Sequence, residues 1–463
     1  MQVGTVQKLI NIFNQSFREL GVVVSLEKLE DLSVTVHRAM TAHARQFHTL
    51  EHVFTFVDVN DPIRNLAALY HDIVYFQVDM GFSPPIWEMI APYVRQSNTV
   101  FFVAENLTPE DHLVALIMDV FDLTPGQKLS SISALNEFLS ALVMCKQIGD
   151  LVSKKDLLRM TLCIEATIPF RPFTADGKSH FEVMEEILPG ICERFGIECS
   201  DEERVAAIKT AVLFANKDIE NFGESDPSRF LDNTWNLLPE TNAALRMPDV
   251  YSISTYRQAL SKMDAFFENL DPNTVFSQYR GLPSDEEYQQ LTRYARNNIR
   301  IAREFLRIKI LGTTIIEALA KATGGDAPLS LFLGDLPREG TSIKRLEYFL
   351  PEIDYAPWVD QHSVLYRLLE TGRTSDVDFD MKNSPLSLFI YRTMPPEKIE
   401  EAMERAKDFY AGKLQAHDFL MTLDPFVVQS IARASSIMVF TRRQTLLKYA
   451  GEGDVSRFST SNF

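Results

Sequence analysis

The hydrophobic positions of this chain recur mainly at spacings of three and four residues, and stretches of alternating apolar and polar residues are scarce. The first spacing places apolar side chains on one face of an α-helix, whereas alternation would indicate a half-buried strand. The pattern therefore predicts an all-α protein. The expected helices cover residues 4–20, 26–44, 62–75, 85–95, 109–121, 130–148, 154–166, 179–195, 200–222, 226–239, 254–270 and 284–307.

The expected helix over 62–75 differs from the others because apolar residues cover most of its circumference. Asp61 and Pro62 provide an N-cap and a first-turn proline for it. A helix that is apolar on all sides is a buried one. We therefore expect His71 and Asp72, near its end, to lie in or beside a core, where polar side chains need partners.

The length of 463 residues exceeds what one ordinary core requires, so more than one domain is expected. The stretch LDPNTVFSQYRGLP marks the candidate boundary. We expect a first domain over 1–270, a linker over 271–283 and a helical C-terminal domain of unknown role over 284–463. The leucine and aromatic content of that last region suits a small core or a surface through which the chain forms a homo-oligomer.

Charge and composition exclude several classes of function. The net charge of −17 argues against broad binding to nucleic acid or to an anionic membrane surface. No run of about 18 apolar residues is present, so no membrane span is expected. The four cysteines, which have no Cys-x-x-Cys spacing, fit reduced thiols. We therefore expect a cytoplasmic protein.

Histidines are concentrated between residues 43 and 75, which hold four of the nine in the chain. His48 and His52 are four residues apart and would share one face of a helix. His71 and Asp72 are adjacent. A mixed imidazole and carboxylate set suits a divalent transition metal, Mg²⁺ or Mn²⁺. The simpler interpretation is ordinary polar residues on helices; it is weaker for the whole set, because each side chain supplies a partner for the others.

The helix over 200–222 carries a second polar group in an apolar setting. By helical spacing, Asp218 shares a face with Ala211, Ala215 and Phe222. Burying a carboxylate there is costly unless it is paired or bound to a metal.

FHTLEHV (residues 47–53) followed by LAALYHDIVY (residues 66–75) resembles the HD superfamily of metal-dependent phosphohydrolases. Its pattern is Tyr or Phe followed by His-x-x-x-His, then about twenty residues, then Ala-x-(Phe or Tyr)-His-Asp-x-(Val or Ile)-Tyr. The resemblance covers about residues 30–240 and implies an HD-domain helical bundle.

The resemblance implies roles for individual residues. His52, His71 and Asp72 would be metal ligands, and the family's last ligand is an aspartate on a later helix, for which Asp218 is the best candidate. Asp119 and Asp122 are alternatives, and Asp156 is less favoured because helix capping explains it. His48 would be a general acid or a group that orients the substrate.

Two departures from the family pattern bear on the function. Tyr75 stands where relatives with two metal ions carry a further histidine, which indicates a single ion or a site that has lost activity. Thr49 stands where cyclic-nucleotide phosphodiesterases have asparagine.

The resemblance implies hydrolysis of a nucleotide or another small phosphoester with one divalent ion, whether Mn, Mg, Fe, Ni or Zn. Arg45, Arg171 and Lys178 are candidates for binding the substrate phosphate, because arginine pairs with phosphate through two hydrogen bonds; the simpler interpretation of each is a surface cation. The alternative function is a non-catalytic protein that keeps the HD scaffold for ligand binding, regulation or oligomerisation.

Overall fold

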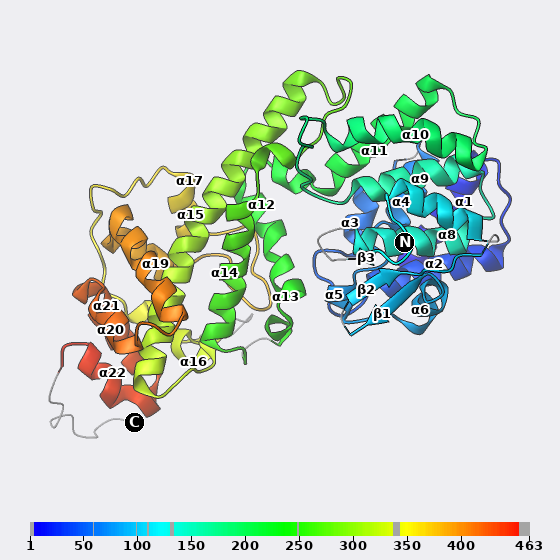
Figure 1. The fold of residues 1–463 in the computed structure, drawn as a ribbon. Helices are drawn as coiled ribbons and strands as arrows, with labels where there is room; N and C mark the ends of the chain where they lie inside the picture. The colour runs from blue at the N-terminus through cyan, green and yellow to red at the C-terminus, as the bar shows by residue number, and fades with distance from the viewer. Residues whose placement is uncertain are drawn as a thin grey trace. The chain divides into compact units, whose positions relative to one another are not determined.

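The chain folds predominantly into α-helices, as the spacing of apolar residues predicts, with one small three-stranded sheet (Figure 1). No helix within the described ranges combines the length and the apolar character needed to cross a bilayer. The computed structural model describes residues 4–58, 60–98, 100–108, 111–129, 134–247, 250–336 and 343–452.

The chain divides into two compact units that differ from the expected domains. Unit 1 comprises Met1–Gly223 and Asp271–Arg296, and unit 2 comprises Glu224–Leu270 and Asn297–Phe463. The segment 271–283, expected to be a linker, is therefore part of unit 1. The chain leaves unit 1 after Gly223, returns at Asp271 and leaves again within one long helix.

Contacts distant in sequence explain this division. Tyr279 is buried in the core of unit 1, and the side chain of Asn216 forms two hydrogen bonds of 2.8 Å with the backbone of Ser277. In unit 2, Arg257 pairs with Glu317 at 2.8 Å. Pairings across such separations leave no local signal in the sequence.

The elements of unit 1 occupy both of its chain segments. They are α1 (Thr5–Glu19), α2 (Leu26–Met40), α3 (Leu50–Thr55), α4 (Pro62–Tyr70), α5 (Phe76–Asp79), α6 (Pro84–Ile90), β1 (Val94–Ser97), β2 (Val100–Val103), α7 (His112–Val120), β3 (Lys128–Leu129), α8 (Leu135–Ile148), α9 (Lys154–Ala166), α10 (His180–Phe195), α11 (Asp201–Asp218), the 3-10 turn η2 (Glu220–Gly223), η4 (Pro272–Thr274) and the start of α15 (Asp285–Thr323).

The sheet is the main element that the spacing analysis missed. β1, β2 and β3 are antiparallel in that order, and Val94 pairs with Val103. Residues 94 and 95, expected at the end of a helix, belong to β1, because α6 ends at Ile90. Strands of two to four residues are too short for a two-residue alternation to be recognised.

Two helix ends near the histidines also differ from expectation. α4 is buried around its circumference as predicted, but it ends at Tyr70, so His71 and Asp72 follow the helix. α2 ends at Met40 and α3 begins only at Leu50. His48 therefore precedes α3 and does not share a helix with His52, contrary to the interpretation of their four-residue spacing.

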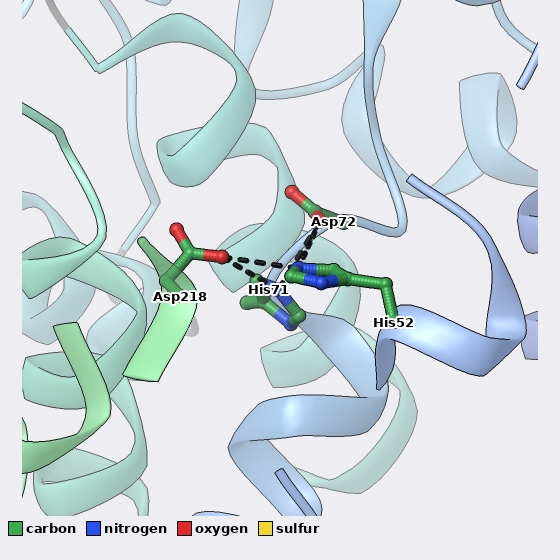
Figure 2. A group of neighbouring side chains, drawn as sticks. All are labelled: His52, His71, Asp72 and Asp218. Atoms are coloured by element: carbon green, nitrogen blue, oxygen red, sulfur yellow. Dashed lines mark hydrogen bonds and ion pairs between the residues drawn. The ribbon is translucent and has the colours of Figure 1, made fainter. Parts of the chain in front are cut away.

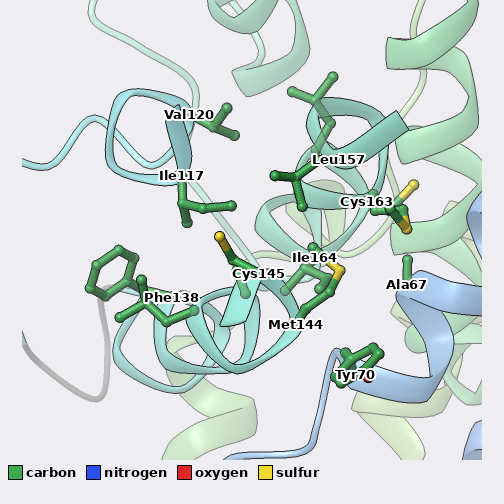
Figure 3. Close-up of a cluster of buried hydrophobic side chains, with 14 of the residues drawn as sticks. Ala67, Tyr70, Ile117, Val120, Phe138, Met144, Cys145, Leu157, Cys163 and Ile164 are labelled. Carbon is green, nitrogen blue, oxygen red and sulfur yellow. The ribbon is translucent and has the colours of Figure 1, made fainter. Parts of the chain in front are cut away.

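The core of unit 1 supports the end of α4 (Figure 3). α9 packs against α4, α8 and α11. Cys145 and Cys163 lie buried among aliphatic and aromatic side chains. Burial raises the pKa of the Cys145 thiol to about 12 and also raises that of Cys163. Both thiols therefore stay protonated and serve as small apolar groups.

Unit 2 is built from helices and 3-10 turns. They are α12 (Pro227–Trp235), α13 (Leu237–Thr241), η3 (Ala243–Arg246), α14 (Ile253–Asn269), the remainder of α15, α16 (Leu329–Leu333), η5 (Leu346–Phe349), α17 (Val364–Glu370), α18 (Pro385–Thr393), α19 (Pro396–Tyr410), α20 (Ala416–Met421), α21 (Pro425–Met438), η6 (Phe440–Arg442) and α22 (Arg443–Tyr449).

Candidate metal centre

Four side chains from distant parts of unit 1 converge at one place (Figure 2). His52 comes from α3, His71 and Asp72 from the end of α4, and Asp218 from the last residue of α11. One ligand atom of each lies within 4.8 Å of the others. Elsewhere in the part of the chain that the structure describes, no group of three or more His, Cys, Asp or Glu side chains is arranged to hold an ion.

Both imidazoles of this cluster face both carboxylates. His52 Nε2 lies 3.1 Å from Asp218 Oδ1 and 3.7 Å from Asp72 Oδ2. His71 Nε2 lies 3.1 Å from Asp72 Oδ2 and 3.6 Å from Asp218 Oδ1. The donor set is thus two nitrogens and two oxygens directed at a common point.

One hydrogen bond orients the His71 ring. Its Nδ1 lies 2.8 Å from the carbonyl oxygen of Ala68, which can only accept, so Nδ1 carries a proton and Nε2 faces the cluster. His71 Nε2 and Asp72 Oδ2 are both buried, and neither has a hydrogen bond of suitable geometry among the described residues. Buried polar atoms without such partners are rare and costly, and the same ring orientation is common in histidines that bind metals.

The electrostatics of the cluster favour a bound cation. Burial lowers the pKa of His71, but the carboxylates of Asp72 and Asp218 outweigh it and raise the pKa well above the usual value. The pKa values of Asp72 and Asp218 are both lowered. Burial alone would raise them, but the neighbouring imidazoles have a larger, opposite effect. Two ionised carboxylates side by side in a partly buried site are stabilised by positive charge, from a proton on His71 or from a metal ion.

Aromatic rings and backbone contacts hold the ligands in place. The ring of Phe56 lies 5.2 Å from that of His52 and 4.8 Å from that of His71, and Phe214 packs against His71 at 5.6 Å. Just beyond Asp72, the backbone N–H of Val74 donates to the hydroxyl of Ser140. The cluster therefore sits on packed elements of unit 1.

His48 lies at the edge of the cluster. Its ring centroid is 6.2 Å from that of His52, and the positive charge that it can carry contributes to the lowered pKa of Asp72. The ring of Tyr75 packs against that of His48, with 4.4 Å between their centroids. His48 thus lies beside the four converging side chains.

The three candidate phosphate-binding cations are engaged elsewhere. The side chain of Arg45 is inaccessible to solvent and binds Asp79 and the carbonyl oxygen of Asp72. Arg171 is held by Glu165. Lys178 is a surface cation that pairs with Glu186 at 2.6 Å.

The alternative carboxylates also have other partners. Asp119 binds Arg194, with Nη1 at 2.7 and 2.8 Å from its two oxygens, and Asp156 caps α9 together with Ser153. Asp122 is not part of the converging group.

Glu137, on α8, was missed by the sequence analysis. Burial and the charges of Asp72 and Asp218 raise its pKa to about 7. Its carboxyl group can therefore gain or lose a proton near neutral pH beside the cluster. The only local signal is a single carboxylate on a helix whose other residues are mostly apolar.

Comparisons of this chain with protein-family models, with curated proteins and with solved structures find no match.

Proposed function

We propose that the protein is a metal-dependent phosphohydrolase of the HD type that hydrolyses a nucleotide or another small phosphoester. The observation that carries the proposal is the convergence of two imidazoles and two carboxylates on one partly buried point. His71 Nε2 and Asp72 Oδ2, which lack suitable hydrogen bonds, fit a coordinated ion. Two nitrogen and two oxygen donors suit Mn, Fe, Ni or Zn, and Mg less well.

The order of these residues along the chain supports membership of the HD superfamily. His52 precedes the His71–Asp72 pair, and the last ligand comes from a later helix, as in that family. The packing of Tyr75 against His48, where some relatives have a ligand, supports a single ion.

The residues of the site would have different roles in hydrolysis. His52, His71, Asp72 and Asp218 would hold a divalent ion, and that ion would supply a Lewis acid for activating water and polarising a phosphoryl oxygen. We assign to His48 the donation of a proton to the leaving oxygen, because its half-buried ring lies at the edge of the cluster. Glu137 is a second group that exchanges a proton near neutral pH.

Metal analysis of the purified full-length protein tests the proposal first. We expect about one ion per chain in the wild type and less than about a tenth of that in His71→Ala and Asp218→Asn, since loss of one of four ligands leaves an incomplete site. Asp119→Asn is the matched control, because Asp119 pairs with Arg194 outside the cluster. Substoichiometric metal in the wild type, unchanged by His71→Ala, would contradict the proposal.

A screen of nucleotides and simple phosphoesters with added Mn, Mg, Fe, Ni or Zn then tests hydrolysis. We expect activity that His48→Gln reduces without loss of metal. Stoichiometric metal without hydrolysis of any phosphoester would favour the non-catalytic alternative. A homo-oligomer formed through the C-terminal region stays a prediction, which the molecular mass in solution would test.

A further inference from the structure

Unit 1 contains a cavity of about 620 Å³ that is separate from the metal cluster. Its walls are the loop after α9, the first turn of α10, one face of α11 and the segment 273–288. None of the four converging side chains belongs to these walls. A cavity of this size is typical of sites for small organic ligands. The proposed metal centre therefore leaves this cavity unexplained.

One turn of α11 connects the cavity with the cluster. Ala215, Asn216 and the C-cap residue Ile219 line the cavity. Successive residues of a helix are about 100° apart, so Asp218 points about 100° away from the middle of that face. There it belongs to the cluster. A shift of this turn would therefore affect both sites.

The segment that closes the cavity is fixed to the same turn. The Asn216 amide donates to the carbonyl of Ser277 and accepts from its N–H, both at 2.8 Å. Two hydrogen bonds in opposite directions hold this wall against α11. A ligand that packs against the wall therefore also restrains the end of α11 that carries Asp218.

The charges around the cavity are balanced. Glu165, whose side chain is only 4% exposed, binds Arg171 Nη1 at 2.5 Å and His180 Nε2 at 2.8 Å. Arg280 pairs with Glu185. A charged ligand would lose its hydration here without meeting an excess of opposite charge, which is unfavourable. The cavity therefore favours an uncharged ligand.

Aromatic side chains form the apolar part of the lining. Phe173 lines the cavity with 52% of its surface exposed, and Phe170 and Phe276 lie in the same lining. Phenyl groups in a concave site offer faces and edges against which another aromatic ring can pack. The ligand that fits these side chains is therefore aromatic.

Two polar side chains of the lining keep hydrogen-bonding capacity. The guanidinium of Arg171 retains N–H donors beyond those directed at Glu165. Gln278 donates through Nε2 to the carbonyl of Pro283 and to Asp285, and no described residue donates to its oxygen. One uncharged donor set and one acceptor complement a carboxamide, whose carbonyl accepts and whose N–H groups donate.

We propose that this cavity is an effector site for a small uncharged aromatic compound that carries a carboxamide-like group, and that its occupancy strengthens metal binding at the cluster through the last turn of α11. The ligand acts as a regulator and not as a substrate, because the cavity contains none of the metal-binding side chains. The site itself is independent of the proposed function. The coupling rests on that function, because it requires the metal centre.

Titrations of the full-length, metal-free protein, followed by ligand-observed NMR, test the site. Benzamide is the uncharged probe, and benzoate and benzylamine are its anionic and cationic counterparts. We expect both ions to bind at least about tenfold more weakly than benzamide, because each loses its hydration beside paired charges. Phe173→Ala should weaken benzamide binding about tenfold, since one ring of the lining is lost, and Phe173→Tyr should restore it. Phe266→Ala is the control, because Phe266 is a similarly exposed phenylalanine in unit 2.

A second variant tests the carboxamide. Arg171→Lys keeps a cation beside Glu165 but loses the guanidinium donors. It should weaken benzamide binding about threefold to tenfold and leave the binding of toluene, which has no carboxamide, unchanged. Equal losses for the two probes would overturn the role of Arg171. No binding of benzamide, equal binding of benzoate or benzylamine, or binding that Phe173→Ala leaves unchanged would overturn the site.

Calorimetric titration with Mn²⁺, with and without saturating benzamide, tests the coupling. We expect benzamide to tighten Mn²⁺ binding by wild type about fivefold, the lower end of the usual range for coupled sites, and Mn²⁺ to tighten benzamide binding by the same factor. Asp218→Asn should bind benzamide within a few-fold of metal-free wild type and lose the effect of Mn²⁺. Identical Mn²⁺ affinity with and without bound benzamide would overturn the coupling.

The same measurements separate this inference from the proposed function. Stoichiometric metal in a protein that does not bind benzamide would overturn the effector site and leave the proposed function intact. Benzamide binding that depends on Phe173, in a wild-type protein that binds no metal, would support the site and refute both the proposed function and the coupling.

Discussion

Arg45 provides a sharp test of the physical account of this site, because sequence and structure assign it different roles. Sequence proximity suggested that it binds the substrate phosphate. In the structure its guanidinium donates to both oxygens of Asp79, at 2.9 and 2.7 Å, and to the carbonyl of Asp72 at 2.6 Å. The last carbonyls of a helix lack intrahelical partners, and a cation at that end is favourable. Arg45 thus holds the turn that follows α4 and carries the His71–Asp72 pair.

The expected loss of stability on replacing Arg45 follows from the burial of its ion pair with Asp79. The side chain of Arg45 is 0% exposed and that of Asp79 is 20% exposed. Breaking a buried ion pair by removing one partner costs about 3–5 kcal/mol. Because Asp79 keeps some access to water, we expect Arg45→Met to lower the free energy of unfolding by about 3 kcal/mol, the lower end of this range. In a unit of this size that corresponds to a fall in the melting temperature of about 6–12 °C.

Differential scanning calorimetry of the metal-free protein measures this fall in melting temperature. Metal analysis measures the binding of an ion at the cluster. Arg45→Met should also reduce metal binding, because the turn that carries Asp72 loses its anchor. Arg38→Met, a change at an exposed arginine of α2, is the control and should leave both properties within error. A residue that only bound substrate would change KM alone. An unchanged melting temperature with a raised KM would therefore refute the structural role.

Three further predictions concern pH and charge. Without metal, stability should fall as the pH rises toward the raised pKa of His71, because the imidazolium pairs with both carboxylates; its contribution is complete below the unfolded pKa of about 6.5. Thermal melts should show a steeper fall in wild type than in His71→Gln. Glu137, with its pKa raised to about 7, destabilises the fold once ionised. Glu137→Gln should therefore stabilise metal-free protein by about 1–3 kcal/mol at pH 8 and by almost nothing near pH 4, as measured by urea unfolding. In unit 2, Asp380 lies 3.1 Å from the buried Lys309. Asp380→Asn should cost about 3 kcal/mol in urea unfolding and leave the metal content unchanged.

The sequence alone predicts those features that depend on neighbours a few residues away. The apolar circumference of α4 marks a buried helix because helical spacing is local, and every residue from Ile63 to Tyr70 except Arg64 is buried. Asp218 could be singled out because its position on an apolar face makes an unpartnered carboxylate costly. The same reasoning misjudged the helix ends, since it could not include the guanidinium of Arg45.

Only the tertiary structure decides which distant groups meet. Glu137 owes its raised pKa first to burial in the packed unit and then to the charges of Asp72 and Asp218, which are far from it in sequence. The segment 271–288 becomes part of unit 1, and a wall of the cavity, through Asn216 and the burial of Tyr279. Sequence periodicity thus determined the helical class. Residue type and spacing indicated which residues are able to bind an ion. Burial and charge pairing between remote segments determined where those residues converge, because these energies depend on distance in space and not along the chain.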